Sequence, residues 1–298
     1  MSEFRFGFAA LAGVPNVGKS TLINRLMGKK ISIISRRPQT TRHRILGIYT
    51  ADDFQIAMVD MPGLEPRPRS GLDRVIRKTA VSSMSDVDLI LFMIDSRGWH
   101  DAPRQAFELV RGMNLPVLLI INKIDCLDDK AKLLPLIEES NNLHPFSEII
   151  PISARKLPDD KAFCSIVAQH LPLCAPGFPE EMTTDRSDRF QASELVREQT
   201  YLLLGQELPY SISAETTRFE VDGKGTLCVD VTLWVEKPGQ KSIVIGKQGS
   251  MLKRIGSGAR RQMEKAFSRS VYLSLWVKVK KGWPDRDTQL KSFGYIES

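Results

Sequence analysis

The stretch Gly13-Val14-Pro15-Asn16-Val17-Gly18-Lys19-Ser20-Thr21 follows an apolar run at residues 6–12 and opens a helical pattern. In the spacing G-x-x-x-x-G-K-S, the glycines let backbone N–H groups curl around an anion, the lysine reaches the β- and γ-phosphates, and the hydroxyl binds Mg²⁺. A strand before the loop and a helix after it place the helix N-terminus against the phosphates. The sequence therefore predicts a phosphate-binding loop whose contacts come from Gly13, Asn16, Val17, Gly18, Lys19, Ser20 and Thr21.

Apolar runs of strand length alternate with helix-length segments over the first 172 residues. The runs are 6–12, 45–49, 54–59, 89–94, 117–121 and 148–152. This rhythm is typical of a wound α/β sheet, and runs that are apolar almost throughout indicate strands covered by helices on both faces. Ligands in such a sheet bind at the carboxyl ends of the strands.

The chain is expected to form two domains joined by a linker. Residues 173–187 are rich in proline and glycine and show little periodicity, which separates a first domain (1–172) from a second (188–298). The second begins with a helix at about 190–206, continues with strands at 212–221 and 226–235, and ends with helical material and a strand at 271–279. It is a smaller α+β domain.

Composition limits the possible classes of protein. The chain has 298 residues, of which 42% are hydrophobic, as expected of a folded protein. No apolar run reaches the roughly 18 residues of a membrane span, so any membrane contact is expected to be peripheral. The four cysteines lack C-x-x-C spacing, which indicates neither a disulfide framework nor a zinc site and fits the cytoplasm.

A carboxylate follows the run 54–59, in the motif Asp60-Met61-Pro62-Gly63. At a strand end, such an Asp holds Mg²⁺ in nucleotide-hydrolysing enzymes, and the tight turn would bring the Gly63 N–H to the γ-phosphate. By itself the motif is common in turns. The upstream phosphate loop makes the metal interpretation the stronger one.

The motif Asn122-Lys123-Ile124-Asp125, after the run 117–121, predicts which base is bound. Guanine presents N1–H and N2–H₂ side by side, and a carboxylate accepts both, whereas adenine has an acceptor at N1. Asp125 therefore favours GTP and GDP over ATP. Lys123 can lie over the base plane, Asn122 can tie this loop to the phosphate loop, and Ser153-Ala154 can complete the pocket.

The polar segment 35–44 is too basic for a core. A hydroxyl there can close over Mg²⁺ while the γ-phosphate is present and leave after hydrolysis. Thr41 is favoured over Thr40 for this role, and His43 is expected to be structural or RNA-facing rather than a base. The expected metal ligands are Ser20, Thr41 and Asp60, and the residues expected to act in hydrolysis are Lys19, Thr41, Asp60 and Gly63.

Leu64 stands where Ras-type enzymes have a glutamine that orients water. Leucine cannot do this by hydrogen bonding, so hydrolysis is expected to be slow without a partner. Asn16 is either a plain turn residue or helps to hold a monovalent cation such as K⁺ near the bond that breaks.

Positive charge is concentrated near the C-terminus. Between residues 237 and 281 there are twelve Lys or Arg and one acid, Glu264, so this segment has a charge of +11. The whole chain has a net charge of +7, which leaves −4 for the other residues. The motif Gly246-Lys247-Gln248-Gly249 lies in this segment, followed by Lys253 and Arg254. A G-x-x-G turn between helices lets a nucleic-acid backbone approach closely, although alone it is also an ordinary helix–helix turn. These six residues are the expected RNA contacts; Gly256 and Gly258 are expected to break or kink the second helix.

Together the motifs resemble those of the Era family of bacterial ribosome-assembly GTPases. The matching segments are Gly13–Ser20, Gln39–His43, Asp60–Gly63, Asn122–Asp125, Ser153-Ala154, the G-x-x-G turn and the tail 276–283. The main departures are Met61, where members more often have Thr, and a compact segment at 51–53. The likeness covers nearly the whole chain.

The resemblance implies a Ras-like P-loop domain and a type II KH domain, with a short helix at 241–245 where periodicity alone would indicate a strand. It implies GTP hydrolysis to GDP with Mg²⁺, binding to the 3′ region of small-subunit ribosomal RNA, and maturation of the small ribosomal subunit by a cytoplasmic monomer. One alternative is a signalling GTPase that contacts the inner face of the cell membrane through anionic lipid. Another is an RNA-binding module with a vestigial G domain, against which the intact Lys19, Ser20, Asp60 and Asp125 argue.

Overall fold

The computed structural model describes residues 4–35, 37, 40–64, 71–205 and 208–295. The chain divides into two compact units. Unit 1 comprises residues 1–32, 41–68 and 76–185, and unit 2 comprises residues 33–40, 69–75 and 186–298. Each unit has its own sheet and core.

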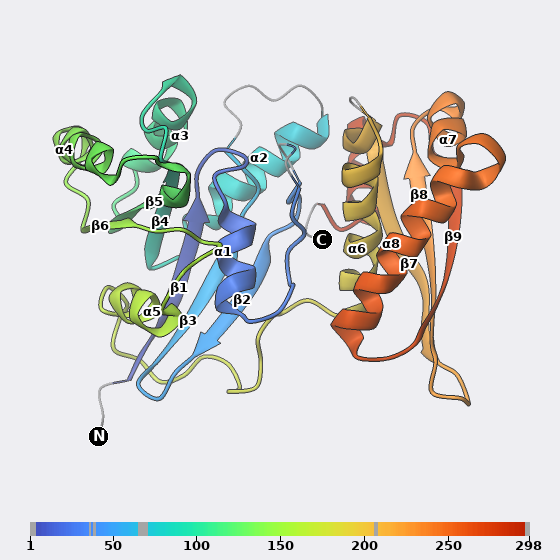
Figure 1. The fold of residues 1–298 in the computed structure, drawn as a ribbon, viewed down its shortest axis with the longest axis horizontal. Helices are drawn as coiled ribbons and strands as arrows, with labels where there is room; N and C mark the ends of the chain where they lie inside the picture. Colours follow the sequence, from blue (N-terminus) through green and yellow to red (C-terminus); the bar gives the residue numbers. More distant parts are fainter. Residues whose placement is uncertain (1–3, 36, 38–39, 65–70, 206–207, 296–298) are drawn as a thin grey trace. The chain divides into compact units, whose positions relative to one another are not determined.

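Unit 1 is built on a six-stranded sheet in the order β2-β3-β1-β4-β5-β6 (Figure 1). The strands are β1 (Arg5–Ala12), β2 (Ile45–Thr50), β3 (Phe54–Asp60), β4 (Leu89–Asp95), β5 (Val117–Asn122) and β6 (Glu148–Pro151). The helices are α1 (Lys19–Leu26), α2 (Gly71–Ser83), α3 (Asp101–Arg111), α4 (Leu133–Leu143) and α5 (Asp160–Ala168), and the first residues of α2 belong to unit 2. The wound α/β sheet is thus confirmed.

One strand departs from the parallel arrangement that a wound sheet suggests. β2 pairs antiparallel with β3, while the other neighbours are parallel. The reason is the short connection at residues 51–53, because a link of this length can join only antiparallel neighbours.

The site is positioned by the strands at the centre of this sheet. Every residue of β3, β4 and β5 is buried, as expected for strands covered on both faces. Each of these strands ends on a polar residue: Asp60, Asp95 and Asn122 respectively. Polar side chains from three strands therefore emerge at one edge of an apolar sheet.

The proline-rich segment after α5 is packed against unit 1. The backbone N–H groups of Gly177 and Phe178 donate to Gln55 Oε1 at 3.0 and 2.9 Å. The Phe178 ring meets Phe6 and Phe8 edge to face. Up to residue 185, this stretch is part of unit 1.

Unit 2 has a three-stranded sheet in the order β7-β8-β9, with α6 and α8 side by side (Figure 1). Its elements are α6 (Asp188–Leu203), β7 (Ile212–Val221), β8 (Leu227–Val235), α7 (Pro238–Ile245), α8 (Ser250–Phe267), β9 (Val271–Val279) and α9 (Asp287–Ser292). Short 3₁₀ helices lie at Ile124–Cys126 and Lys130–Lys132 in unit 1 and at Leu208–Ser211, Lys247–Gly249 and Trp283–Asp285 in unit 2. Helix α7 confirms the short helix expected at 241–245.

The prediction that Gly256 and Gly258 break or kink the second helix is wrong. Helix α8 runs unbroken from Ser250 to Phe267. A Cβ on Gly258 would lie 2.2 Å from Gln199 Oε1 of α6, and one on Gly256 would lie 3.3 Å from the Leu275 side chain of β9. The glycines allow this close packing, which offsets a helix-propensity cost of roughly 1 kcal/mol each.

Among the described residues, no helix combines the length and the apolar character that a membrane span requires. Over the same residues, no three His, Cys, Asp or Glu side chains are grouped to hold a metal ion. The four cysteines are free.

Candidate nucleotide site and nucleic-acid surface

The phosphate loop requires glycine at two positions for steric reasons. Gly13 has φ 138° and Gly18 has φ 113°, which L side chains rarely adopt. A Cβ on Gly13 would lie 2.3 Å from the Met93 carbonyl oxygen, and one on Gly18 would lie 2.1 Å from Asn122 Nδ2. The loop is therefore fixed in shape by strands β4 and β5 as well as by its own sequence.

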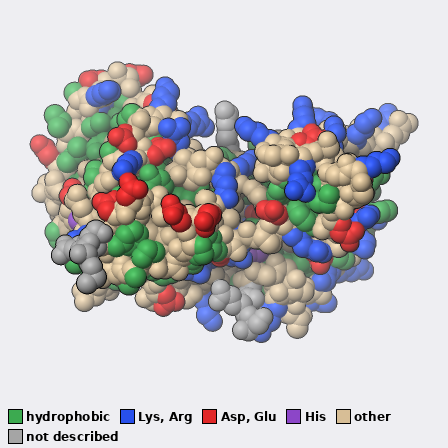
Figure 2. All heavy atoms as spheres, turned by 90° about the horizontal axis from the view of Figure 1, so that it is seen from below, with side chains coloured by type: hydrophobic (Ala, Val, Ile, Leu, Met, Phe, Trp, Pro, Cys, Tyr) green, Lys and Arg blue, Asp and Glu red, His purple; other side chains and the backbone are tan. Residues whose placement is uncertain are grey.

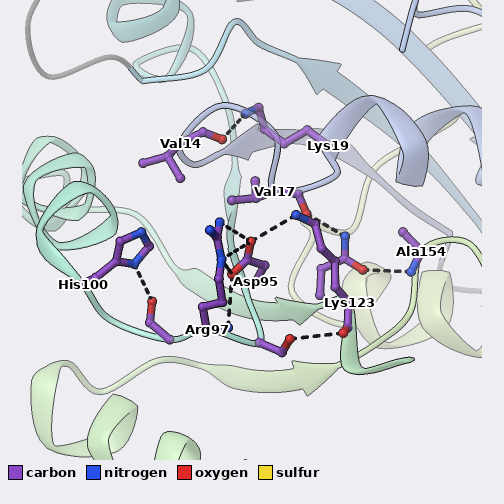
Figure 3. A network of polar contacts seen from close by, with 11 residues as sticks. Val14, Val17, Lys19, Asp95, Arg97, His100, Lys123 and Ala154 are labelled. Atoms are coloured by element: carbon purple, nitrogen blue, oxygen red, sulfur yellow. Dashed lines mark hydrogen bonds and ion pairs between the residues drawn. The ribbon is translucent and has the colours of Figure 1, made fainter. Parts of the chain in front are cut away.

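The ammonium group of Lys19 is buried at the start of α1. Its Nζ donates to the carbonyl oxygen of Gly13 at 2.9 Å and to that of Val14 at 3.0 Å. Figure 3 shows the bond to Val14. Burial lowers the pKa of Lys19 to about 8, although the Asp60 carboxylate opposes this shift. A phosphate group near this desolvated cation would stabilise its charged form.

Asp60 is the centre of a small cluster of hydroxyl groups. Its Oδ2 accepts hydrogen bonds from Ser20 Oγ at 2.9 Å and from Ser32 Oγ at 2.7 Å, and Thr41 Oγ1 lies 2.9 Å from Ser20 Oγ. Asp60 Oδ1 is buried and meets no hydrogen-bond donor in the part of the chain that the structure describes. One carboxylate with hydroxyls suits Mg²⁺, which takes its other ligands from phosphates and water. The residues present therefore fit the ion.

The two neighbouring threonines have different surroundings. Thr40 Oγ1 donates to the Arg37 carbonyl oxygen at 2.8 Å and lies 2.6 Å from Ser35 Oγ, away from the carboxylate. Only Thr41 joins the Asp60 cluster, which supports the choice of Thr41 over Thr40. His43 is buried, so of its two expected roles the structural one fits.

Replacing Asp60 by Asn is expected to stabilise the protein in the absence of nucleotide and Mg²⁺. Burial raises the pKa of Asp60, opposed by the Ser32 hydroxyl, the charge of Lys19 and the Ser20 hydroxyl, so the folded state favours the neutral form. Asn is neutral at every pH, and a gain of about 2–4 °C in melting temperature is expected at pH 7.

The pH dependence of that gain provides the control. Because the pKa of Asp60 is raised in the folded state, the carboxyl group of Asp60 lowers the stability of the wild type progressively as pH rises above its unfolded-state pKa, and it carries no such cost at lower pH. The advantage of Asp60→Asn should therefore shrink towards pH 4. Thermal unfolding scans at pH 4 and pH 7 measure it, and a variant less stable than wild type at pH 7 would show that the carboxylate supports the fold.

Asn122 links three segments of the nucleotide site. Its Nδ2 donates to the Val17 carbonyl oxygen at 2.7 Å, and its Oδ1 accepts from the Ala154 N–H at 2.9 Å (Figure 3). The predicted tie between the base loop and the phosphate loop is confirmed. Asp125 follows on an exposed 3₁₀ turn, where its carboxylate is accessible to a base.

Asp95 is a member of this site that the sequence motifs do not reveal. Lys123, in a left-handed conformation with φ 63°, places Nζ 3.0 Å from Asp95 Oδ2, and Arg97 pairs with both carboxylate oxygens (Figure 3). Burial alone would raise the pKa of Asp95, but hydrogen bonds from Arg97 and Lys123 outweigh it and bring the pKa to about 2. The carboxylate is ionised at neutral pH and fixes the Lys123 side chain. Its place at the end of β4 is the one signal that the sequence offered.

The segment after Asp60 lies close to the phosphate loop. A Cβ on Gly63 would lie 2.7 Å from Pro15 Cγ, and the Leu64 N–H donates to the Gly13 carbonyl oxygen at 3.1 Å. The Leu64 side chain is buried, so it is held in the core. Asn16 has φ 65°, a turn conformation that asparagine tolerates.

The G-x-x-G motif of unit 2 forms the turn between α7 and α8. Gly246, Gln248 and Gly249 all have positive φ, at 73°, 52° and 78°. The side chains of Lys247, Gln248, Lys253 and Arg254 are exposed, and Figure 2 shows many Lys and Arg side chains on the right, where unit 2 lies. The structure thus brings all six expected RNA contacts to one turn and the start of one helix.

Both halves of the chain match known protein families. The family described as "50S ribosome-binding GTPase" matches residues 8–123, and the KH domain family matches residues 207–284. The chain is 45% identical over 291 residues to the GTPase Era of Yersinia enterocolitica and to that of Yersinia pestis. Each alignment covers 98% of this chain and 96% of the relative.

Two solved structures are similar to this fold over nearly the whole chain. A crystal structure of Era in complex with MgGDPNP and nucleotides 1506–1542 of 16S ribosomal RNA has a TM-score of 0.93 at 38% identity, covering 99% of this chain and 100% of that one. A variant of Aquifex aeolicus Era bound to GDP and AlF₄⁻ gives the same score, identity and coverage. The protein belongs to the GTPase Era family and is a GTPase with a KH domain.

Proposed function

We propose that this GTPase binds the 3′ region of small-subunit ribosomal RNA through its KH domain and acts in maturation of the small ribosomal subunit. The observation that supports this most is the exposed G-x-x-G turn between α7 and α8, inside a segment with twelve cations and one acid. Close approach of a phosphate backbone needs both features. The similar Era structure with 16S ribosomal RNA indicates the class of RNA.

In this proposal each residue of the nucleotide site has a role. Ser20, Thr41 and Asp60 would hold Mg²⁺, which neutralises charge that develops on the phosphates when bound. Lys19 and the N–H groups of the loop stabilise the β- and γ-phosphates. The lack of a Cβ lets Gly63 lie against Pro15 of the phosphate loop, which supports a contact between the Gly63 N–H and the γ-phosphate. Asp125 accepts the guanine N–H groups, while Asn122, Lys123, Ser153 and Ala154 shape the pocket.

The proposed organisation assigns hydrolysis to residues 1–172 and RNA binding to residues 188–298, with 173–187 as the connection. The packing of 177–178 on Gln55 supports a linker that begins as part of the first unit. The protein is proposed to act as a monomer in the cytoplasm.

GTP hydrolysis is expected to be severalfold faster in K⁺ than in Na⁺. The reason is that Leu64 is buried and apolar, so another group must stabilise charge on the bond that breaks, and Asn16 lies in the loop beside it. Steady-state rates in the two salts measure the effect, with Asn16→Ala expected to abolish the difference. Equal rates in both salts, with Asn16→Ala like wild type, would leave Asn16 as a plain turn residue.

The alternative partner for the basic surface is anionic lipid at the inner face of the membrane. A flotation assay with anionic vesicles and competing single-stranded RNA separates the two possibilities. Under the proposed function, RNA keeps the protein from the vesicles at equal phosphate concentration. Protein that floats with vesicles despite saturating RNA would support the membrane alternative.

A further inference from the structure

Lys123 follows strand β5, but two residues at the end of the neighbouring strand β4 hold it. Asp95 Oδ2 accepts a hydrogen bond from Lys123 Nζ at 3.0 Å (Figure 3). Ser96 Oγ donates to the Lys123 carbonyl oxygen at 3.2 Å. The ammonium group and the backbone of this lysine are therefore both attached to β4, and its side chain keeps one arrangement where a free lysine would sample many.

The backbone of Lys123 also has a conformation that lysine rarely adopts. Its φ is 63°, in the left-handed region. Such a conformation persists where the surrounding structure fixes it, and it is found most often at functional sites. Asp95 is the partner of Asn122 in the register of β4 and β5, and neighbouring strands lie about 4.8 Å apart. The Lys123 side chain thus spans the edge of the sheet from β5 to β4.

Arg97 is the other partner of Asp95, but it does not explain why this carboxylate is buried. Its side chain is 72% exposed, whereas that of Asp95 is 4% exposed. An ion pair with so exposed an arginine contributes little to stability, while a buried carboxylate is costly to desolvate. A role that Asp95 performs through Lys123 explains its burial better than a stabilising role does.

The contact with Asp95 limits what Lys123 can offer to a base. The ammonium group is paired with a carboxylate, so the part of the side chain that remains for a base is the apolar stem. Lysine stems commonly cover apolar surface while the charged end binds elsewhere. The position of the stem, and with it the quality of the contact with a base, is therefore set by a residue that need not touch the nucleotide.

We propose that Asp95 is a positioning residue for the guanine base: it holds the Lys123 side chain across the edge of the sheet, so that the base meets a fixed apolar stem. Ser96 supports the same lysine at its carbonyl group. Asp95 acts on the base end of the nucleotide, because the phosphate end is assigned to Lys19 and the phosphate loop. This inference rests on the proposed place of the base beside Lys123 and Asp125.

The first test is Asp95→Asn in the full chain. Asn has a similar size, but it is neutral and cannot bind the lysine ammonium group as a carboxylate does. The KM for GTP is expected to rise about tenfold and kcat to stay within about twofold, because the lost contact is equal in the ground state and the transition state. The Kd for labelled GDP, measured by titration, should rise by the same factor as KM.

A cycle with Lys123→Met tests whether Asp95 acts through Lys123. Met has a stem of similar length but no group that a carboxylate can hold, so this variant should lose about as much GDP affinity as Asp95→Asn does. The double variant should bind GDP within about twofold of either single variant, since all three lack the same contact. Losses that multiply in the double variant would show that the two residues act independently, and they would overturn the proposal.

Asp88→Asn is the matched control, directly before the first residue of the same strand. Asp88 Oδ2 accepts a hydrogen bond from the Phe8 N–H at 2.8 Å, at the opposite end of β4 from Asp95. The chemical change is the same, and any general loss of stability is reported by the melting temperature. KM and GDP affinity of this variant should stay within about twofold of wild type.

Asp95→Asn with the KM and GDP affinity of wild type would overturn the proposal, as would a fall in kcat at unchanged KM. If Asp95→Asn does not fold, as judged by its melting curve, Ser96→Ala decides in its place: a raised KM supports the proposal and a wild-type KM overturns it. Asp125→Asn belongs in the same series. Unchanged GDP affinity in that variant would instead reject the proposed base site.

Discussion

The Asp125→Asn variant is expected to bind GDP more weakly by about 2–4 kcal/mol, because it loses a charge-assisted pair of hydrogen bonds and turns a donor towards guanine N1–H. The exposed position of Asp125 beside the fixed Asn122 means that the change alters recognition and leaves the core unaffected. Titration with labelled GDP measures the loss. Xanthosine diphosphate has a carbonyl group where guanine has its amino group, so the variant should bind it better than wild type does.

Asp128→Asn is the matched control for this change. Asp128 is an exposed acid three residues further on, and the same loss of one charge there should leave GDP affinity within about twofold of wild type. Unchanged GDP affinity in Asp125→Asn would remove guanine selection from this turn.

The Gly249→Asp variant is expected to weaken RNA binding by about 2–4 kcal/mol and to leave GDP affinity unchanged, because it places a negative charge where a phosphate should lie. Among the residues that the structure describes, no atom outside the adjacent residues lies within 4 Å of a Cβ at Gly249, so there is space for the side chain. Gly246 is the poorer position, because a Cβ there would lie 2.7 Å from Met251 Cβ and disturb the turn. Titrations of labelled RNA and of GDP on the same variant measure both effects.

Gly249→Asn separates charge from size. Asn is as large as Asp, tolerates the positive φ of 78°, and is neutral, so it should lose much less affinity for RNA. Lys247→Ala should lower the slope of log K against log salt concentration by roughly 0.7. RNA affinity of Gly249→Asp equal to that of wild type would show that RNA does not bind at this turn.

Local sequence was sufficient to predict the phosphate loop, the strands and the turn at 246–249. Gly18, Lys19 and Ser20 have their roles through spacing along the chain, and the strands are recognisable because they are apolar throughout. Asn122 could be tied to the loop in advance because the carboxyl ends of neighbouring parallel strands share one edge of the sheet.

The other features of the fold and the site could not be predicted from local sequence, because they depend on contacts between segments that are distant in the sequence. Asp95 belongs to the site because its carboxylate binds the Lys123 side chain, which is distant in the sequence. Ser32 donates a hydrogen bond to Asp60, which is 28 residues further along the chain. Gly258 seemed a helix breaker because the close approach of α6 cannot be read from the sequence of α8 alone. The hydrogen bond from Arg197 to Thr40 spans 157 residues and has no local pattern.

Crosslinking of the protein to RNA in cells, followed by sequencing of the bound fragments, tests the central claim most directly. Wild type and Gly249→Asp would be compared, with Gly249→Asn as the control for size. The account predicts that fragments from the 3′ region of small-subunit ribosomal RNA are enriched with wild type and with Gly249→Asn and are lost with Gly249→Asp. Enrichment of other RNA, or the same fragments with Gly249→Asp, would contradict it.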